Sequence, residues 1–360
     1  MKEFLIVAGA RPNFMKIAPL IASLKKRGVH YFLVHTGQHY DPALSDVFFK
    51  ELSIPAPDAH LGVGSAPRIE QTQKIVQALL PILQTRNIEA ILTVGDVMST
   101  AAAAMAGVTA GVPIVHIEAG LRSYNWQMPE ELNRMIADHY SELLFTPDEA
   151  AARLLYKEGI NREHVFVVGN IMIDSLMANL DRLENSSILS RLDLQPKTYG
   201  LLTLHRGENV DDKETFSHIW SILEEVAKRH PLVFPMHPRT RARVKAFGFQ
   251  EIPNMIIIEP TGYIDLLQLM KHASFALTDS GGIQEETTVL SIPCLTLRTE
   301  TERPVTEDIG TNLVVGHDKA KTISSVECIL RGDWKQGNVP ELWDGKTAER
   351  IADILINHEF

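Results

Sequence analysis

Short apolar runs alternate with longer amphipathic stretches along almost the whole chain. In the first half the runs cover residues 4–8, 31–35, 90–94, 114–117, 143–145 and 164–168. They are nearly continuous in apolar character, as parallel strands are when helices cover both faces of the sheet. Stretches with helical periodicity, such as 66–86 and 98–110, lie between them. The alternation predicts βαβ units and therefore an α/β fold.

The same alternation restarts after about residue 169. The later runs cover residues 200–204, 232–236, 255–258, 275–278, 294–297 and 313–315, with helical stretches at 214–229, 264–271 and 283–290. The polar segment 184–197 interrupts the regularity, so we place the domain change near residues 169 and 170. A last helix, predicted within 345–360, can pack back onto the first domain. The chain therefore reads as two doubly wound parallel-sheet domains facing a cleft, residues 1–169 and 170–344, with ligand sites beyond the carboxyl ends of the strands.

Composition narrows the classes of function. The chain has 360 residues, a length that suits two α/β domains. Its net charge of −10 argues against a general nucleic-acid binder, although local cations and helix N-termini can still hold an anionic small ligand. Two cysteines form no metal-binding or disulfide pattern. No apolar stretch approaches membrane-spanning length, so we expect a cytoplasmic protein.

The turn after the first strand carries two cations. Gly9 permits a sharp turn, and Pro12 stands where a helix can begin. Arg11 and Lys16 flank the start of that helix, which suits a diphosphate or a developing anion. The alternative is a pair of solvated surface cations. The glycine spacing lacks the dinucleotide fingerprint, which disfavours NAD.

Three acidic side chains follow neighbouring strands of the first domain. Asp96 comes directly after a strand, where it can act in catalysis or cap the next helix. Glu118 ends an apolar strand, where a carboxylate is costly unless it is paired, with Arg122 as a nearby candidate, or functional. Glu130 opens a helix, whose dipole alone favours negative charge. Together these carboxylates can converge at one sheet edge and exchange a proton.

The second domain supplies cationic and phosphate-binding features. His205 follows one strand, and His237 and Arg239 follow the next, in a spacing that favours an anionic ligand over a metal. Next, Thr-Asp-Ser-Gly-Gly leads from a strand into a helix. The helix opening at Ser280, Gly281 and Gly282 predicts a phosphate site built from free backbone N–H groups. One turn later, Glu285 or Glu286 can take both hydroxyls of a ribose, and Arg298 and Arg303 can close over the site.

In this order, the motifs resemble those of the non-hydrolysing UDP-N-acetylglucosamine 2-epimerases. The most specific pieces are Arg-Pro-Asn-Phe-Met-Lys-Ile-Ala-Pro, Glu-Ala-Gly-Leu-Arg-Ser, Pro-Glu-Glu-Leu-Asn-Arg, Thr-Asp-Ser-Gly-Gly-Ile-Gln-Glu-Glu and Thr-Glu-Arg-Pro. The resemblance spans nearly the whole chain. It implies a glycosyltransferase-B-type fold of two Rossmann-like domains, a UDP-sugar substrate, no cofactor and a homodimer.

The resemblance also assigns roles to residues. It implies that Ser280 and Gly281 hold the phosphates and that Glu286 holds the ribose. Tyr263 corresponds to the position that places the uracil through backbone and stacking contacts. The family's catalytic carboxylates correspond to Asp96, Glu118 and Glu130, and the groups that hold or activate the diphosphate correspond to His205, Arg11 and Lys16.

Four motifs depart from the usual family pattern. The chain has Asp96-Val-Met-Ser-Thr instead of a threonine run, Gly9-Ala-Arg-Pro-Asn instead of Gly-Thr-Arg-Pro-Glu, and His205-Arg-Gly-Glu instead of His-Arg-Arg-Glu. The loop Gln38-His-Tyr-Asp-Pro lacks the arginine of members that a second UDP-sugar activates, which argues against such activation.

The family reaction removes the C2 proton while UDP leaves C1, and UDP then adds back to 2-acetamidoglucal. It needs proton-handling groups on two faces of the sugar and a site for the departing diphosphate. Four alternatives share parts of this pattern. They are the same epimerisation on a diacetamido uronic acid sugar, a hydrolysing epimerase, a glycosyltransferase of the same fold, and a non-catalytic nucleotide-sugar sensor.

Overall fold

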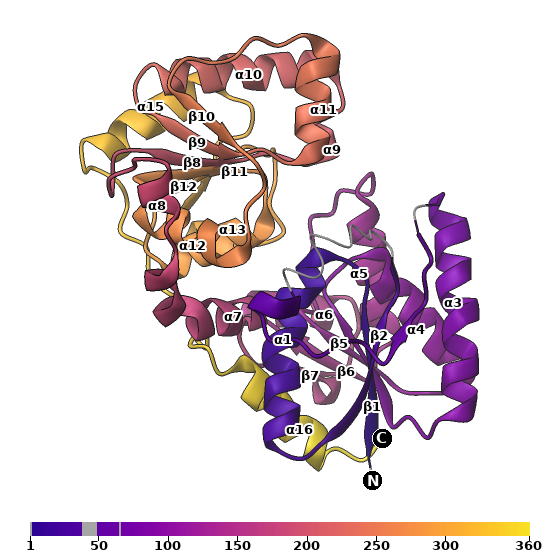
Figure 1. Cartoon of the computed structure of the whole chain (residues 1–360). Coiled ribbons are helices and arrows are strands. Elements are labelled where there is room, and N and C mark those ends of the chain that lie inside the picture. Colours follow the sequence, from indigo (N-terminus) through magenta and orange to yellow (C-terminus); the bar gives the residue numbers. More distant parts are fainter. Residues whose placement is uncertain (1, 38–48, 65) are drawn as a thin grey trace. The chain divides into compact units, whose positions relative to one another are not determined.

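The computed structural model describes residues 2–37, 49–64 and 66–360. The chain forms two compact units, Met1–Ala178 together with Glu341–Phe360, and Asn179–Pro340 (Figure 1). Each predicted apolar run forms a strand, and the α/β class is confirmed. No helix within the described ranges combines the length and the apolar character needed to cross a membrane.

In the described residues of the first unit, seven parallel strands form one sheet in the order β3-β2-β1-β4-β5-β6-β7. The strands are β1 (Glu3–Ala8), β2 (His30–His35), β3 (Ala59–His60), β4 (Ala90–Val94), β5 (Ile114–Ile117), β6 (Leu143–Thr146) and β7 (Val165–Val167). The helices are α1 (Arg11–Lys26), α3 (Arg68–Thr85), α4 (Met98–Ala110), α5 (Pro129–Tyr140), α6 (Glu149–Lys157), α7 (Ile171–Asn179) and α16 (Thr347–Asn357). The strand order reverses between β1 and β4, which is the switch point of a doubly wound sheet.

The second unit repeats this plan with six parallel strands in the order β10-β9-β8-β11-β12-β13 within the described chain. They are β8 (Gly200–Thr203), β9 (Leu232–Pro235), β10 (Met255–Ile258), β11 (Phe275–Thr278), β12 (Cys294–Thr296) and β13 (Asn312–Val314). The helices are α8 (Ile188–Arg191), α9 (Gly207–Val210), α10 (Lys213–Ala227), α11 (Pro238–Phe247), α12 (Tyr263–His272), α13 (Gly281–Val289), α14 (Pro304–Asp308) and α15 (Lys319–Leu330). Its switch point lies between β8 and β11.

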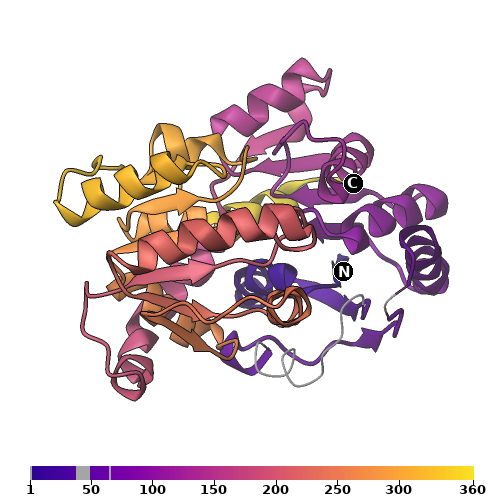
Figure 2. The same ribbon diagram turned by 90° about the horizontal axis from the view of Figure 1, so that it is seen from above.

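Side-chain size decides how the layers pack. The alanine-rich helix α4 is buried along almost its whole length, and its small side chains let α3 and the sheet approach it closely. In the second unit Phe216, Ile219 and Trp220 of α10 pack on the sheet, and α15 lies beside α10 (Figure 2). Such burial of large apolar side chains contributes about 1.5–3 kcal/mol each.

The division between the units falls after Ala178, later than the predicted change near Gly169. The reason is that α7 packs on the first unit, where Ile173 and Leu176 are fully buried. Asp174 of α7 also accepts hydrogen bonds from the backbone N–H groups of Thr347 (3.1 Å) and Ala348 (2.6 Å). These bonds fix the start of α16, which lies beside α1 (Figure 1).

Candidate active site

The turn between β1 and α1 is hydrogen-bonded to the end of β4. A Cβ atom on Gly9 would lie 1.9 Å from Ser99 Oγ, so only glycine fits there. The side chain of Asn13 accepts from the N–H groups of Gly9 (3.0 Å) and Ala10 (3.2 Å) and donates to the Val94 carbonyl (2.9 Å). The side chain of Arg11 lies outside the described part of the structure, as does the loop that begins at Gln38.

Lys16, one turn into α1, forms a buried ion pair with Glu118. Glu118 directly follows β5 and has a φ of 71°, a left-handed conformation that is uncommon for a glutamate. A Cβ atom on Gly95 would lie 2.7 Å from Lys16 Nζ, so this ion pair lies against the turn after β4. Lys16 is thus the ion-pair partner of Glu118, and Arg122, the nearby candidate partner, forms ion pairs with Asp138 and Glu158.

Asp96 follows Gly95 at the end of β4, and its carboxylate contacts an arginine. Its Oδ2 lies 2.6 Å from Arg134 Nη1, and its carbonyl accepts a bond of 2.9 Å from Asn133 Nδ2. The residue at the start of α4 is Val97, which offers no side-chain cap. The carboxylate of Asp96 is therefore bound from α5 rather than used only to cap α4.

Glu130 is half-buried on the first turn of α5, beside the fully buried Glu131. Glu131 accepts from the N–H groups of Ser123 (3.0 Å) and Tyr124 (2.9 Å) and from Arg134 Nη2 (2.5 Å). Burial opposes the charge of Glu131, but the bonds from Arg134 and Ser123 outweigh it and lower its pKa. Arg134 thus links Glu131 to Asp96. The spacing of Glu131 and Arg134 is typical of helix ion pairs, but it gives no sign of the contact between Arg134 and Asp96.

In the second unit His205 follows β8 and lies against a buried acid. Its Nδ1 is 3.0 Å from Asp279 Oδ1, while Asp279 Oδ2 accepts from the backbone N–H groups of His205 (2.9 Å) and Arg206 (2.8 Å). Burial opposes the charge of Asp279, but the His205 charge and these bonds lower its pKa to about 2. Asp279 belongs to the Thr-Asp-Ser-Gly-Gly motif, yet the sequence analysis gave it no role.

His237 lies beside His205, with ring centroids 5.7 Å apart. The His237 side chain caps α11 by accepting from the Arg239 N–H (3.2 Å). Arg239 itself forms an ion pair with Asp211, and the distance from Arg239 Nε to Asp211 Oδ1 is 3.1 Å. The structure thus brings the two predicted histidines together and gives the predicted arginine an acidic partner.

The predicted phosphate site is the start of α13. Ser280 is the N-cap residue, its side chain makes no capping bond, and Gly281 and Gly282 begin the helix. A Cβ atom on Gly281 would lie 2.4 Å from Arg303 Nη1, so this guanidinium lies against the helix start. Arg303 is held there by Glu285, at 2.7 Å. Helix N–H groups and a guanidinium therefore converge on one point, which favours an anion.

Glu286 is fixed by Tyr263. Tyr263 Oη donates to Glu286 Oε1 at 2.7 Å, and both side chains are buried. Burial, followed by the Glu286 charge, raises the pKa of Tyr263 well above its usual value. The phenol therefore stays protonated and orients the Glu286 carboxylate. This contact is an addition to the uracil-placing role that the resemblance implies for Tyr263.

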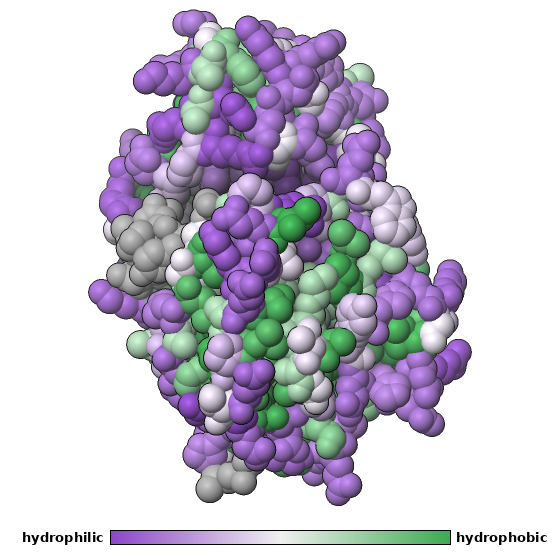
Figure 3. Space-filling view, turned by 90° about the vertical axis from the view of Figure 1, so that its right-hand side faces the viewer, coloured by the Kyte–Doolittle hydropathy of each residue, from purple (hydrophilic) through white to green (hydrophobic). Residues whose placement is uncertain are grey.

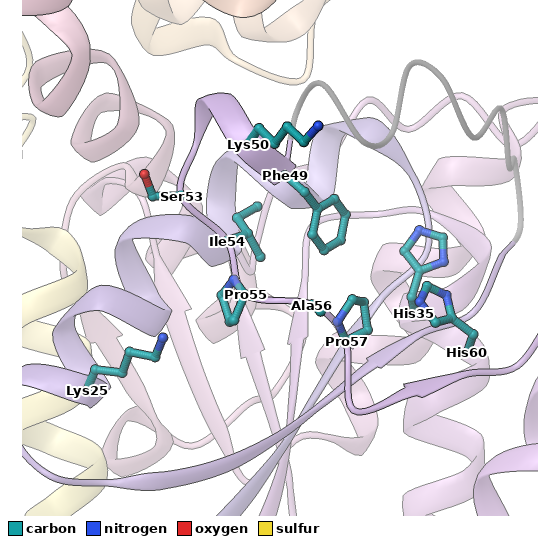
Figure 4. A pocket seen from close by; sticks show the side chains of 10 residues that line it. All are labelled: Lys25, His35, Phe49, Lys50, Ser53, Ile54, Pro55, Ala56, Pro57 and His60. Carbon is teal, nitrogen blue, oxygen red and sulfur yellow. The ribbon is translucent and has the colours of Figure 1, made fainter.

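A separate cavity of about 560 Å³ lies in the first unit (Figure 4). Its described lining residues are Lys25, His35, Phe49, Lys50, Ser53, Ile54, Pro55, Ala56, Pro57 and His60, and these include no predicted site residue. Burial, followed by the neighbouring His60, lowers the pKa of His35 to about 4. Across the described residues, no group of three His, Cys, Asp or Glu side chains could hold a metal ion.

Two doubly wound units, each with charged side chains at its switch point, define a two-domain α/β protein of the glycosyltransferase-B type. A family model of UDP-N-acetylglucosamine 2-epimerases matches residues 22–356, and the chain belongs to this family. It is 39% identical to the UDP-N-acetylglucosamine 2-epimerase of Methanocaldococcus jannaschii, covering 97% of this chain and 98% of that one.

A solved structure and a second relative are also similar to this chain. A crystal structure of the M. jannaschii UDP-GlcNAc 2-epimerase in complex with UDP-GlcNAc and UDP matches with a TM-score of 0.93 and 38% identity, over 99% of this chain and 100% of that one. The UDP-2,3-diacetamido-2,3-dideoxy-D-glucuronate 2-epimerase of Pseudomonas aeruginosa is 34% identical, over 98% of this chain and 99% of that one.

Proposed function

We propose that this protein interconverts UDP-N-acetylglucosamine and UDP-N-acetylmannosamine by inverting C2. The observation that carries the proposal is that Asp96 and Glu118 follow the paired strands β4 and β5, each with its carboxylate beside a cation. A glycosyltransferase or a nucleotide-sugar sensor of this fold needs the nucleotide site but not these acids.

The second unit is proposed to bind the UDP moiety. The start of α13 and Arg303 suit the diphosphate, and Glu286 suits the ribose hydroxyls. The uracil then lies near the start of α12, at Tyr263. The remaining proposed contacts to the diphosphate and sugar are Arg11, Lys16, His205, His237, Arg239, Ser280, Gly281 and Gly282.

The proposed reaction is an anti elimination followed by re-addition. A base removes the C2 proton, the C–H electron pair forms the C1=C2 bond, and the C1–O bond breaks with its electrons leaving on UDP. For return, a UDP oxygen attacks C1 while C2 takes a proton on the opposite face. Asp96 supplies one of the two proton-handling groups, and Glu118 or Glu130 supplies the other. His205 and the α13 start stabilise the charge on departing UDP. The scheme is redox-neutral and uses no cofactor.

Proton NMR of the protein with UDP-N-acetylglucosamine in D₂O tests this proposal. We expect deuterium to enter C2 and the signals of UDP-N-acetylmannosamine to appear without any added cofactor. If UDP binds but neither change occurs, the nucleotide site stands and the epimerase proposal fails. Free N-acetylmannosamine as the product would instead identify a hydrolysing enzyme.

A second candidate substrate is UDP-2,3-diacetamido-2,3-dideoxy-D-glucuronate, because a relative that is 34% identical is named for that sugar. Both sugars present the same C2–H and C1–O bonds to the site. Comparing kcat/KM for the two substrates decides between them. We expect the value for UDP-N-acetylglucosamine to be the higher one.

We also propose a cytoplasmic homodimer. Both cysteines are unpaired, as is usual in a reducing compartment. Apolar side chains gather on the face of the first unit that carries α3 (Figure 3). Exposed large apolar residues on α3, α4 and α5 include Ile69, Val108 and Leu132. Sedimentation equilibrium tests the dimer, and a triple Ser variant at these three positions should favour the monomer.

A further inference from the structure

His116 is the single polar residue of strand β5, and it is fully buried. β5 lies between β4 and β6, so the imidazole is surrounded by protein. A buried imidazole is costly unless its nitrogens find hydrogen-bond partners. No sequence motif assigns a role to His116, and the proposed reaction does not use it.

Both ring nitrogens of His116 face acceptor oxygens. Nδ1 lies 2.6 Å from Asp138 Oδ1, and Nε2 lies 2.8 Å from the Gly95 carbonyl oxygen. A carbonyl can only accept. The other oxygen of Asp138 accepts from Arg122 Nη1 (2.6 Å) and from the Gly120 N–H (3.2 Å), as a carboxylate does. Each imidazole nitrogen must therefore donate a hydrogen bond.

The surrounding charges balance a His116 ring that carries both protons. Arg122 contacts Asp138 on one side and Glu158 on the other, with Nε and Nη2 lying 2.8 and 2.6 Å from the two Glu158 oxygens. Burial opposes the charge of Asp138, but His116 and then Arg122 lower its pKa. Two cations thus meet two carboxylates, and a buried charge cluster is tolerable only when it is paired in this way.

The second N–H of His116 reaches the turn that carries Asp96. Gly95 has a φ of 66° and links β4 to Asp96. From α5, Asn133 binds the Asp96 carbonyl and Arg134 binds its carboxylate. From β5, His116 binds the carbonyl of Gly95. The peptides on the two sides of Asp96 are therefore held from two different elements: His116 of β5 binds the Gly95 carbonyl, and Asn133 of α5 binds the Asp96 carbonyl.

We propose that His116 is a positioning residue, whose two donated hydrogen bonds fix the Gly95–Asp96 turn and thereby aim the Asp96 carboxylate. This inference rests on the proposed function, in which Asp96 handles a proton of the sugar. His116 does not touch the substrate. It acts by holding Asp96 within the narrow range of positions that proton transfer requires.

Two substitutions of His116 distinguish its hydrogen bond to Asp138 from its hydrogen bond to the Gly95 carbonyl. In His116→Gln the amide nitrogen can reach the place of Nε2 and keep the bond to Gly95. In His116→Asn it lies nearer the place of Nδ1 and can keep only the bond to Asp138. We expect C2–H exchange at saturating substrate to fall about 100-fold in the Asn variant and less than about tenfold in the Gln variant. UDP affinity should stay within about twofold in both, since most of the residues proposed to bind UDP are in the other unit.

The matched control is His230, a half-buried histidine of the second unit whose Nε2 contacts Ser274 Oγ at 3.0 Å. His230→Asn and His230→Gln should leave the exchange rate unchanged. Equal losses in the two His116 variants, or no loss in either, would overturn the positioning role. So would losses that simply follow the lowered free energy of unfolding of each variant.

The protonation of both His116 nitrogens can also be measured in the wild-type protein, so this test does not depend on whether a variant folds. NMR of ¹⁵N-histidine-labelled protein near neutral pH should show N–H protons on both nitrogens of one protected imidazole, and the signals should change in His116→Gln. One N–H proton alone would contradict the hydrogen-bond assignment. This result does not depend on the reaction. If the wild-type protein shows no C2 exchange, the proposed function is rejected. The NMR result still decides whether both nitrogens of His116 carry N–H protons.

Discussion

The two units share the strand order around their switch points but differ in the charges that follow particular strands. In the first unit the side chains that follow β4 and β5 are acids, and cations restrain them, as Lys16 does Glu118 and Arg134 does Asp96. In the second unit the side chains that follow β8 and β9 are basic, and acids restrain them, as Asp279 does His205 and Asp211 does Arg239. One fold thus provides a proton-handling edge in one unit and an anion-binding edge in the other.

The difference shows that topology decides where chemistry occurs, while the residues after the strands decide which chemistry it is. In both units the restraining partner comes from a different element than the group it holds. Such partners fix side-chain direction, which a site on loops needs. If the first unit handles protons and the second binds UDP, substitutions in the first unit should lower the rate of C2–H exchange, and substitutions in the second should lower the affinity for UDP.

The largest effect is expected from the acids of the first unit. Asp96→Asn or Glu118→Gln should lower C2–H exchange by about a thousandfold, the usual range for losing a positioned acid or base. UDP affinity, measured by calorimetry, should change less than about twofold in Asp96→Asn. Glu118 pairs with Lys16, a proposed contact to the diphosphate, so Glu118→Gln is judged by its exchange rate alone. Asp353→Asn, on the surface of α16, serves as the control. A large loss of UDP affinity in Asp96→Asn would remove the distinction between the units.

Glu286→Gln should produce the converse result. Loss of a charged acceptor for the ribose hydroxyls should weaken UDP binding about 10- to 100-fold, since hydrogen bonds to charged groups contribute roughly 1.5–3 kcal/mol. Exchange at saturating substrate should fall much less than in Asp96→Asn. Calorimetry and deuterium exchange on the same protein preparation give both values. If the affinity of this variant for UDP is unchanged, Glu286 does not bind the ribose.

The charge of Asp279 should appear in the pH dependence of stability. Its pKa of about 2 in the folded state lies below the value of about 3.8 expected when unfolded. The stabilisation is therefore present above about pH 4 and is lost as the pH falls toward about 2. Its size is on the order of 2 kcal/mol.

Urea unfolding of wild type and Asp279→Asn across this pH range measures the effect. The difference in free energy of unfolding should shrink as the pH falls. Asp318→Asn, which removes a charge but keeps a side-chain oxygen that can cap α15, is the control from the same unit. A difference that stays constant with pH would mean that the charge of Asp279 does not stabilise the fold.

The smallest effect is expected from Tyr263→Phe, which removes only the hydroxyl that orients Glu286. UDP affinity should fall about fivefold, equivalent to roughly 1 kcal/mol for one hydrogen bond. The pair of variants at Tyr263 and Glu286 forms a double-mutant cycle. If the two effects add fully, the phenol does not act through Glu286.

The sequence predicted the fold well because buried parallel strands are continuous apolar runs that need no knowledge of their neighbours. The two-residue strand β3 escaped prediction because Ala59 and His60 are too few to show a pattern. The domain change was placed too early because the packing of α7 on the first unit depends on the distant segment around Thr347.

Candidate site residues were predictable from their positions after strands, but their partners were not. Arg134 of α5 binds Asp96 in the turn after β4, and Asp279 meets His205 across two neighbouring strands. Such pairs depend on how elements meet in space. The one sequence signal for His116 was its polar side chain within an apolar strand, which indicates a buried hydrogen bond but not its partner.

The most direct test of the account follows both bonds of the elimination in one wild-type sample. UDP-N-acetylglucosamine with ¹⁸O in the C1–O–P bridge is incubated with the protein in D₂O. Deuterium at C2 is then compared with movement of ¹⁸O to non-bridging phosphate positions. Elimination of UDP predicts that both occur, because the C2–H and C1–O bonds break in the same reaction. Deuterium at C2 with ¹⁸O left in the bridge would contradict elimination and the assignment of leaving-group chemistry to the second unit.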